Sequence, residues 1–490
     1  MNQEQAPILD GIAEYHRLDR YGFTPPGHRL DRGIDAYTLE VLGRDPFRGD
    51  LLASSGLDDR MSSNGYLSTA QELMAEAVGA DHAFFSTCGS SLSVKAAILA
   101  VTRGEGEILI GRDSHKSVTS GLVLSGLQPR WIQPRYDEDQ HMAHPPSPET
   151  VEAMWERYPD ASAALVVSPT PYGTCADLAA IVDICHRRGK PLIVDEAWGA
   201  HLPFHGDLPT WAMDAGADIC VVSVHKMGLG FEQGSVYHLQ GELVDPTRLS
   251  QCADVLATTS ANVLIYAGLD AWRRRMVLEG EQLLGSALDL ARRVRAEVDG
   301  IDGLHVLEKE LVHEEASHDL DILHVLIDLD RLGISGYQAA DWLREHERID
   351  LGTSDHRHIE AVLSTADDDD TAERLLTGLR HLAGAAAELP KPSPVRLPSQ
   401  ADLALETVML PRDAFFGPVE VVPVADAVGR IAAEQITPYP PGIPVALPGE
   451  RINQAVVDYL TSGVAAGMEL PDPGDPTLRT VRVAREEPGS

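Results

Sequence analysis

Two residues of opposite charge stand at the ends of apolar runs that are typical of buried strands. Asp195 follows the run in PLIVDEAW (191–198), and Lys226 ends ICVVSVHK (219–226). If these strands neighbour one another in a parallel sheet, both side chains lie at its carboxyl edge. A lysine amine there can condense with the aldehyde of pyridoxal phosphate (PLP), and a carboxylate can keep the pyridine nitrogen of PLP protonated. Taken alone, the two residues fit a structural ion pair equally well.

A serine-rich segment offers groups for the phosphate of such a cofactor. TCGSSLS (87–93) follows the apolar run AFFST (83–87) and opens a helical pattern. Gly89 permits close backbone approach, while Ser90 and Ser91 offer hydroxyl and N–H groups at the positive end of the helix. Because serine is common at helix starts, this segment by itself is a weak indication.

Two histidines and a further serine fit the same pocket. His115, in GRDSHKS (111–117), follows another apolar run and either lies flat on the pyridine ring or caps a helix. Ser223 and His225 come directly before Lys226 and are within reach of the same phosphate. The alternative for His225 is a structural role as a histidine of the protein core. Together with Asp195, these residues indicate a cofactor pocket.

The predicted strands and helices that must position these residues alternate along the chain between residues 81 and 235. Short apolar runs at 83–87, 107–113, 163–170, 191–198 and 219–226 are separated by helical patterns. This alternation predicts an α/β fold with a mostly parallel sheet covered on both faces.

The rest of the chain indicates further domains. A long amphipathic helix is predicted over 266–298, followed by a smaller α/β unit with a strand at 321–329 and a helix at 336–346. The proline-rich segment 388–400 is typical of a linker. The predicted domains are an N-terminal segment (1–60), a large PLP-binding domain (61–275), a small α/β domain (276–387), a linker (388–403) and a C-terminal domain (404–490).

Composition limits the partners. The formal net charge of −35 disfavours nucleic acid and anionic membranes, and no apolar run is long enough to cross a bilayer. The five cysteines lack the CxxC spacing of metal sites, so we expect no metal and a reducing, cytoplasmic location.

A series of motifs in order along the chain resembles the ornithine/lysine/arginine decarboxylase family of fold-type I PLP enzymes, in particular its short bacterial form. The resemblance spans nearly the whole chain. It is carried by PPGHR (25–29), SGLDD (55–59), AQELMAEAVGADHAFF (70–85), HKSVTSGLVLSG (115–126), SPTPYG (168–173), DEAWGAH (195–201), SVHK (223–226), TTS (258–260), PRDAFF (411–416) and PYPPGIPVALPGE (438–450).

The resemblance implies the aspartate-aminotransferase-like fold and a role for each matching residue. It makes Lys226 the Schiff-base lysine, Asp195 the partner of the pyridinium nitrogen and His115 the stacking histidine. It also implies a phosphate site, a cofactor wall and weaker substrate contacts. The phosphate site comprises Gly89, Ser90, Ser91, Ser223 and His225; Trp198 and Thr170 face the ring; His28 and Glu450 contact the substrate. Glu232 is a further candidate substrate contact that this chain has in place of the family residue.

The same resemblance implies an assembly and a reaction. Thr258, Thr259 and Ser260 correspond to a segment that reaches the phosphate of a neighbouring subunit, which implies a homodimer or larger oligomer with the active site at its interface. The implied reaction is decarboxylation of a basic amino acid, arginine first and then lysine or ornithine, with Lys226 or His225 returning a proton to the α-carbon. Two alternatives stay open: another PLP reaction on this fold (oxidase, aminotransferase or biosynthetic lyase), and a non-catalytic regulatory paralogue.

Four departures from the family pattern bear on the substrate. This chain has PGHR where relatives have PGHK, and LDDRM (57–61) where they have LDDLH. Glu232 replaces a small hydroxyl residue, and Gly352 stands at a position usually held by glutamate. Glu232 is either a cation-binding carboxylate or an exposed loop residue.

Overall fold

The computed structural model describes residues 1–52, 65–439 and 442–485. The chain forms two compact units, each made of two stretches of sequence. Unit 1 comprises residues 1–100 and 191–282, and unit 2 comprises 101–190 and 283–490. The motifs SGLDD and LDDRM lie outside the described residues, and the predicted domain bounds stay a prediction.

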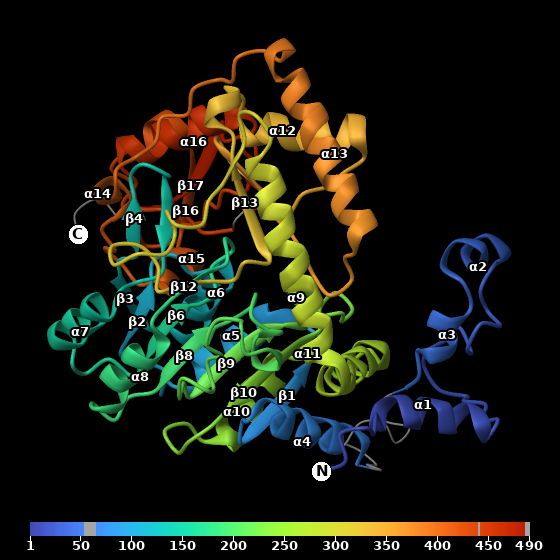
Figure 1. Cartoon of the computed structure of the whole chain (residues 1–490). Helices are drawn as coiled ribbons and strands as arrows, with labels where there is room; N and C mark the ends of the chain where they lie inside the picture. The colour runs from blue at the N-terminus through green and yellow to red at the C-terminus, as the bar shows by residue number, and fades with distance from the viewer. Residues whose placement is uncertain (53–64, 440–441, 486–490) are drawn as a thin grey trace. The chain divides into compact units, whose positions relative to one another are not determined.

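Unit 1 contains four hydrogen-bonded strands, labelled in Figure 1. Their order is β1 (His82–Ser86), β10 (Ser235–Leu239), β9 (Ile219–Ser223) and β8 (Leu192–Asp195). The β8–β9 pair is parallel, with Asp195 opposite Val221, whereas β10 runs antiparallel to both β9 and β1. The helices of this unit include α1 (Pro7–Arg17), α2 (Ala36–Leu42), α3 (Asp45–Gly49), α4 (Tyr66–Val78), α5 (Gly89–Ala100), α9 (Val224–Met227) and α10 (Pro246–Leu256).

Unit 2 contains three parallel strands and a separate antiparallel sheet. The parallel strands are β6 (Ala164–Val167), β2 (Glu107–Gly111) and β3 (Gln128–Ile132). The antiparallel sheet has the order β11 (His305–Val306), β13 (His324–Asp328), β15 (His358–Val362) and β14 (Thr353–Ser354). Helices of this unit include α6 (Lys116–Ser125), α7 (Pro148–Arg157), α8 (Leu178–His186), α12 (Gly336–Trp342), α13 (Asp369–Ala385) and α16 (Gln454–Ala466).

The predicted elements are found close to their expected positions. The five apolar runs form β1, β2, β6, β8 and β9, and most of their residues are buried. The long helix is α11 (Val263–Asp299), three residues longer at its N-terminal end than predicted (Figure 1). Near the C-terminus, α16 and β17 (Thr480–Ala484) contribute to a separate hydrophobic cluster. The predicted α/β fold class is therefore confirmed, with β10 as the antiparallel exception. Among the described residues, no helix is long and apolar enough to span a membrane.

A buried ion pair attaches the N-terminal segment to the start of α11. Arg273 donates to Asp270 at 2.7 Å, and both side chains are fully buried. The same guanidinium donates to the carbonyl oxygens of Gln3 and Gln5, while Asp270 accepts from the backbone N–H of Ile8 at 3.0 Å. Because a buried ion pair is stable only when its remaining polar atoms are bonded, these backbone contacts stabilise the pair and the segment together.

A second buried charge cluster lies in the antiparallel sheet of unit 2. His324 Nδ1 lies 2.6 Å from Glu360 Oε1, and its Nε2 lies 3.8 Å from Asp321. Burial alone would lower the pKa of His324, but the two carboxylates outweigh it and hold the pKa above its usual value of 6.5. The protonated imidazole therefore neutralises part of a buried negative charge.

This cluster predicts a stability that falls with rising pH. Because the folded-state pKa of His324 exceeds the unfolded value, its contribution is complete below pH 6.5 and is lost as pH rises through the folded-state pKa. Glu360→Gln should lower the free energy of unfolding by about 1–3 kcal/mol at pH 6 and flatten this pH dependence. Urea unfolding of both proteins between pH 6 and 9 measures both effects. Glu347→Gln, which removes a partly exposed carboxylate 2.9 Å from His381, is the control. An unchanged slope in Glu360→Gln would contradict the assignment.

Candidate active site

Asp195 ends β8 and is buried, with 3% of its surface exposed. Its carboxylate accepts a hydrogen bond from the backbone N–H of Ala197, while Oδ1 is buried without a hydrogen-bond partner among the described residues. Burial raises the pKa of Asp195, and the nearby charge of Lys226 acts in the opposite direction. A buried carboxylate oxygen without a donor is suited to accept one from a ligand.

Lys226 lies in the short helix α9, directly after β9. Its Nζ stands 4.2 Å from the centroid of the Trp198 ring, which comes from the turn after β8. A cation over an indole face is attracted by the π electrons of the ring. The two neighbouring strand ends therefore bring Asp195, Trp198 and Lys226 to one edge of the unit 1 strands.

The proposed phosphate ligands of unit 1 also meet at this edge. Ser223 Oγ donates to Ser90 Oγ at 2.7 Å, which joins the end of β9 to the first turn of α5. Gly89 has a φ of 73°, and a methyl group added there would meet no atom within 4 Å. The Cβ side of Gly89 is therefore open to close approach at a positive helix end, while its own N–H donates to the carbonyl oxygen of Gln233 at 2.9 Å. Ser91, which follows Ser90 in α5, is exposed.

His225 is half-buried, and its Nδ1 lies 3.2 Å from the carbonyl oxygen of Gly234. Because a carbonyl only accepts hydrogen bonds, Nδ1 carries the proton and Nε2 is the acceptor nitrogen in the neutral ring.

These features fit PLP on physical grounds. Its pyridinium N–H would satisfy the orphan oxygen of Asp195, its aldehyde carbon would meet Lys226, and its phosphate would face Gly89 and Ser90 at the start of α5. These residue roles stay predictions.

Three predicted site residues belong to unit 2. His115 caps α6, with its Nδ1 accepting from the N–H of Ser117 at 3.2 Å, so the helix-cap alternative is realised and the stacking role stays a prediction. Thr170 is buried and bonded to Thr174 through their hydroxyl oxygens at 2.6 Å.

Glu450 is fully buried in unit 2. Arg112 donates to its Oε2 at 3.0 Å, as does the N–H of Leu447, while Oε1 has no hydrogen-bond partner among the described residues. Its carboxylate is therefore held by its own unit, and a substrate contact stays a prediction.

The remaining predicted residues lie near the surface of unit 1. Glu232 is exposed in this chain. His28 pairs with Asp50 at 3.2 Å and contacts the carbonyl oxygen of Leu30. Thr258, Thr259 and Ser260 are exposed, and Ser260 N–H donates to Thr258 Oγ1 at 3.1 Å.

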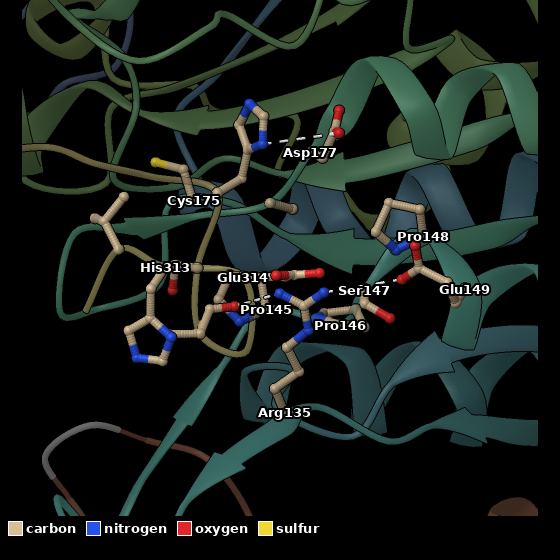
Figure 2. Close-up of a pocket in the computed structure, with 15 residues that line it drawn as sticks. Arg135, Pro145, Pro146, Ser147, Pro148, Glu149, Cys175, Asp177, His313 and Glu314 are labelled. Atoms are coloured by element: carbon tan, nitrogen blue, oxygen red, sulfur yellow. Dashed lines mark hydrogen bonds and ion pairs between the residues drawn. The ribbon is translucent and has the colours of Figure 1, made fainter. Parts of the chain in front are cut away.

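A cavity of about 320 Å³ in unit 2 is a different site (Figure 2). It is lined by Arg135, Asp177, His313, Glu314 and neighbouring residues, and by none of the predicted site residues. Arg135 donates to the carbonyl oxygen of Ala316, and Asp177 caps α8. These groups are bonded within the fold, and the cavity contains no lysine for cofactor attachment.

One buried residue at the site, Glu196, is not among the residues predicted from the sequence. Glu196 follows Asp195 directly and is fully buried. The sequence does carry a signal for this residue, since a second acid directly follows Asp195 at the end of an apolar run. Because charged residues are seldom buried without a partner, such an acid indicates a specific role.

The comparisons with known proteins cover nearly the whole chain. Residues 6–371 match the family model described as Orn/Lys/Arg decarboxylase, major domain, and residues 398–474 match its C-terminal domain. The chain is 38% identical to the arginine decarboxylase of Halalkalibacterium halodurans, over 99% of this chain and 98% of that protein. It is 35% identical to the arginine decarboxylase of Bacillus subtilis, over 99% of each protein.

A solved structure shares the fold. The Francisella novicida lysine decarboxylase LdcF aligns with a TM-score of 0.81 at 20% identity, covering 98% of this chain and 81% of that one.

Replacement of Asp195 tests the pyridinium contact. Asp195→Asn should retain part of the bound PLP but lower turnover at least 100-fold, because the amide cannot stabilise a protonated pyridine nitrogen. Cofactor absorbance and steady-state kinetics measure the two effects. Asp218→Asn removes a buried carboxylate at the other end of β9 and serves as the control. Near-normal turnover in Asp195→Asn would count against the assignment.

Proposed function

We propose that this chain, which belongs to the Orn/Lys/Arg decarboxylase family, converts arginine to agmatine and carbon dioxide. Family membership makes it a PLP-dependent decarboxylase of basic amino acids. The observation that favours arginine is the identity of 35–38% to two arginine decarboxylases over 99% of this chain, against 24% to the lysine decarboxylase LdcA of Pseudomonas aeruginosa over 93% of it.

We propose that Lys226 holds the cofactor and that Asp195 fixes its pyridine nitrogen. When bound, PLP supplies an electron-accepting ring for the electron pair that remains when carbon dioxide leaves. The buried Asp195 Oδ1, without a protein donor, supports a hydrogen bond to a protonated pyridine nitrogen. The face of the Trp198 ring lies 4.2 Å from Nζ, which supports a place for this ring at the wall of the cofactor pocket.

The proton that replaces the carboxyl group is proposed to come from Lys226 or His225. Both residues follow β9 within one helical turn. The bond from His225 Nδ1 to Gly234 leaves Nε2 as the nitrogen that can take up and return a proton.

We also propose a cytoplasmic homodimer or larger homo-oligomer. The exposed segment Thr258–Ser260, on which the resemblance places contacts to the phosphate of a second copy, supports the assembly. Glu232 is exposed in the single chain, and we propose its carboxylate as a contact for a basic substrate. Cysteine spacing supports the cytoplasmic location.

The departure at position 352 changes the local chemistry in unit 2. Gly352 N–H donates to the carbonyl oxygen of Glu360 at 3.1 Å, and a side chain at 352 would begin 3.5 Å from the carboxylate of Glu360. A glutamate at this position would place a second negative charge beside a buried one, which glycine avoids.

A product assay tests the proposal. The holoenzyme is incubated with arginine, lysine, ornithine and neutral amino acids, and products are identified by mass spectrometry. We expect a product from arginine that is lighter by one carbon dioxide, with at least a tenfold preference over lysine. Lys226→Ala should form none and lose the visible absorbance of bound cofactor.

Other outcomes would overturn specific parts of the proposal. A product from lysine or ornithine alone would refute arginine and keep the reaction class. A keto product would indicate an aminotransferase or oxidase. Cofactor absorbance that persists in Lys226→Ala would refute the attachment residue.

A further inference from the structure

The turn after β8 carries three parts of the proposed cofactor site. Asp195 supplies the carboxylate, and Ala197 supplies the N–H that donates a hydrogen bond to it. Trp198 supplies the ring beside Lys226. Their relative positions therefore depend on whatever holds residues 195–199 in place.

Glu196 is the side chain at the centre of that turn, and it points into the protein interior. Its carboxyl Oε2 accepts from Cys220 Sγ at 3.1 Å and from the backbone N–H of Ala212 at 3.4 Å. Cys220 lies on β9 opposite Val194, so the contact joins the turn to the strand that leads to Lys226. The N–H of Glu196 also donates to Val221 at 2.9 Å.

The carboxyl group of Glu196 is enclosed in a way that disfavours a charge. The residue is fully buried, and Oε1 has no hydrogen-bond partner among the described residues. Of the titratable groups facing it, Cys220 is a neutral thiol whose own pKa burial raises, and Asp214 is acidic. Burial therefore raises the pKa of Glu196 well above its usual value.

Gly199 packs closely against the side chain of Glu196. A methyl group added at Gly199 would overlap Glu196 Cγ and crowd Leu202. Gly199 N–H donates to the carbonyl oxygen of Glu196 at 2.8 Å, which closes the turn over the side chain.

We infer that Glu196 is a positioning residue of the cofactor site: its buried carboxyl group anchors the turn 195–199 to β9 through Cys220. The anchor sets the carboxylate of Asp195 and the ring of Trp198 against Lys226. The inference rests on the proposed placement of PLP at Lys226 but does not depend on the identity of the substrate.

Substitutions that separate charge, hydrogen bonding and volume test this role. Glu196→Gln keeps an uncharged acceptor, and Glu196→Met keeps the volume without any acceptor. The full-length chain is titrated with PLP to obtain the dissociation constant, and the visible absorbance of bound PLP is followed from pH 6 to 10. Thermal melting of the chain without PLP measures the structural effect, with Asp218→Asn as the buried-carboxyl control.

Glu196→Gln should keep the dissociation constant within about threefold of wild type and leave the pH midpoint of the absorbance unchanged. Glu196→Met should weaken PLP binding at least tenfold and shift this midpoint by half a pH unit or more. Gly199→Ala, which displaces the side chain without altering it, should act in the same direction as Glu196→Met.

Two results would overturn the inference. A midpoint shift in Glu196→Gln as large as that in Glu196→Met would show that the hydrogen bonds accepted by Glu196 do not position the site. Normal PLP binding in Glu196→Met, with only a lowered melting temperature like that of Asp218→Asn, would reduce Glu196 to a core residue. Failure of the PLP placement is distinct, because Lys226→Ala would then retain the wild-type absorbance.

Discussion

The burial of the Asp195 carboxylate at the end of β8 is the constraint on which the site of unit 1 depends. A charge removed from water is unfavourable unless donors or an opposite charge replace the lost hydration. Here the replacements are the N–H of Ala197 and the nearby ammonium of Lys226, and one oxygen is left for a further donor. The parallel β8–β9 pair makes this possible, because it brings the two strand ends to the same edge.

The same pairing explains why small changes near the site are expected to have large effects. Ser223 ends β9 and Lys226 lies three residues later, so the hydrogen bond from Ser223 to Ser90 and the amine of Lys226 move together. The turn after β8 is tied to β9 through Glu196 and Cys220. A shift of either strand end would therefore displace the carboxylate, the indole ring and the amine relative to one another.

Continuous apolar runs predicted the strands well, because a strand buried on both faces has no polar positions to interrupt it. The same pattern does not predict the direction of β10, because the apolar segment Ser235–Leu239 is equally compatible with parallel and antiparallel pairing. His115 shows a similar limit, since a histidine before a helix fits both a cap and a ring contact.

The sequence by itself determined the fold class, the family and the pairing of an acid with a lysine at two strand ends. These features are local, because periodicity, motif order and residue type can be read along the chain. The tertiary structure decided which buried groups have partners. Arg112 meets Glu450 across 338 positions of sequence, and Cys220 meets Glu196 across 24. Such contacts depend on how strands and loops pack in three dimensions. Only that packing determines which charged groups are buried and how unfavourable their burial is.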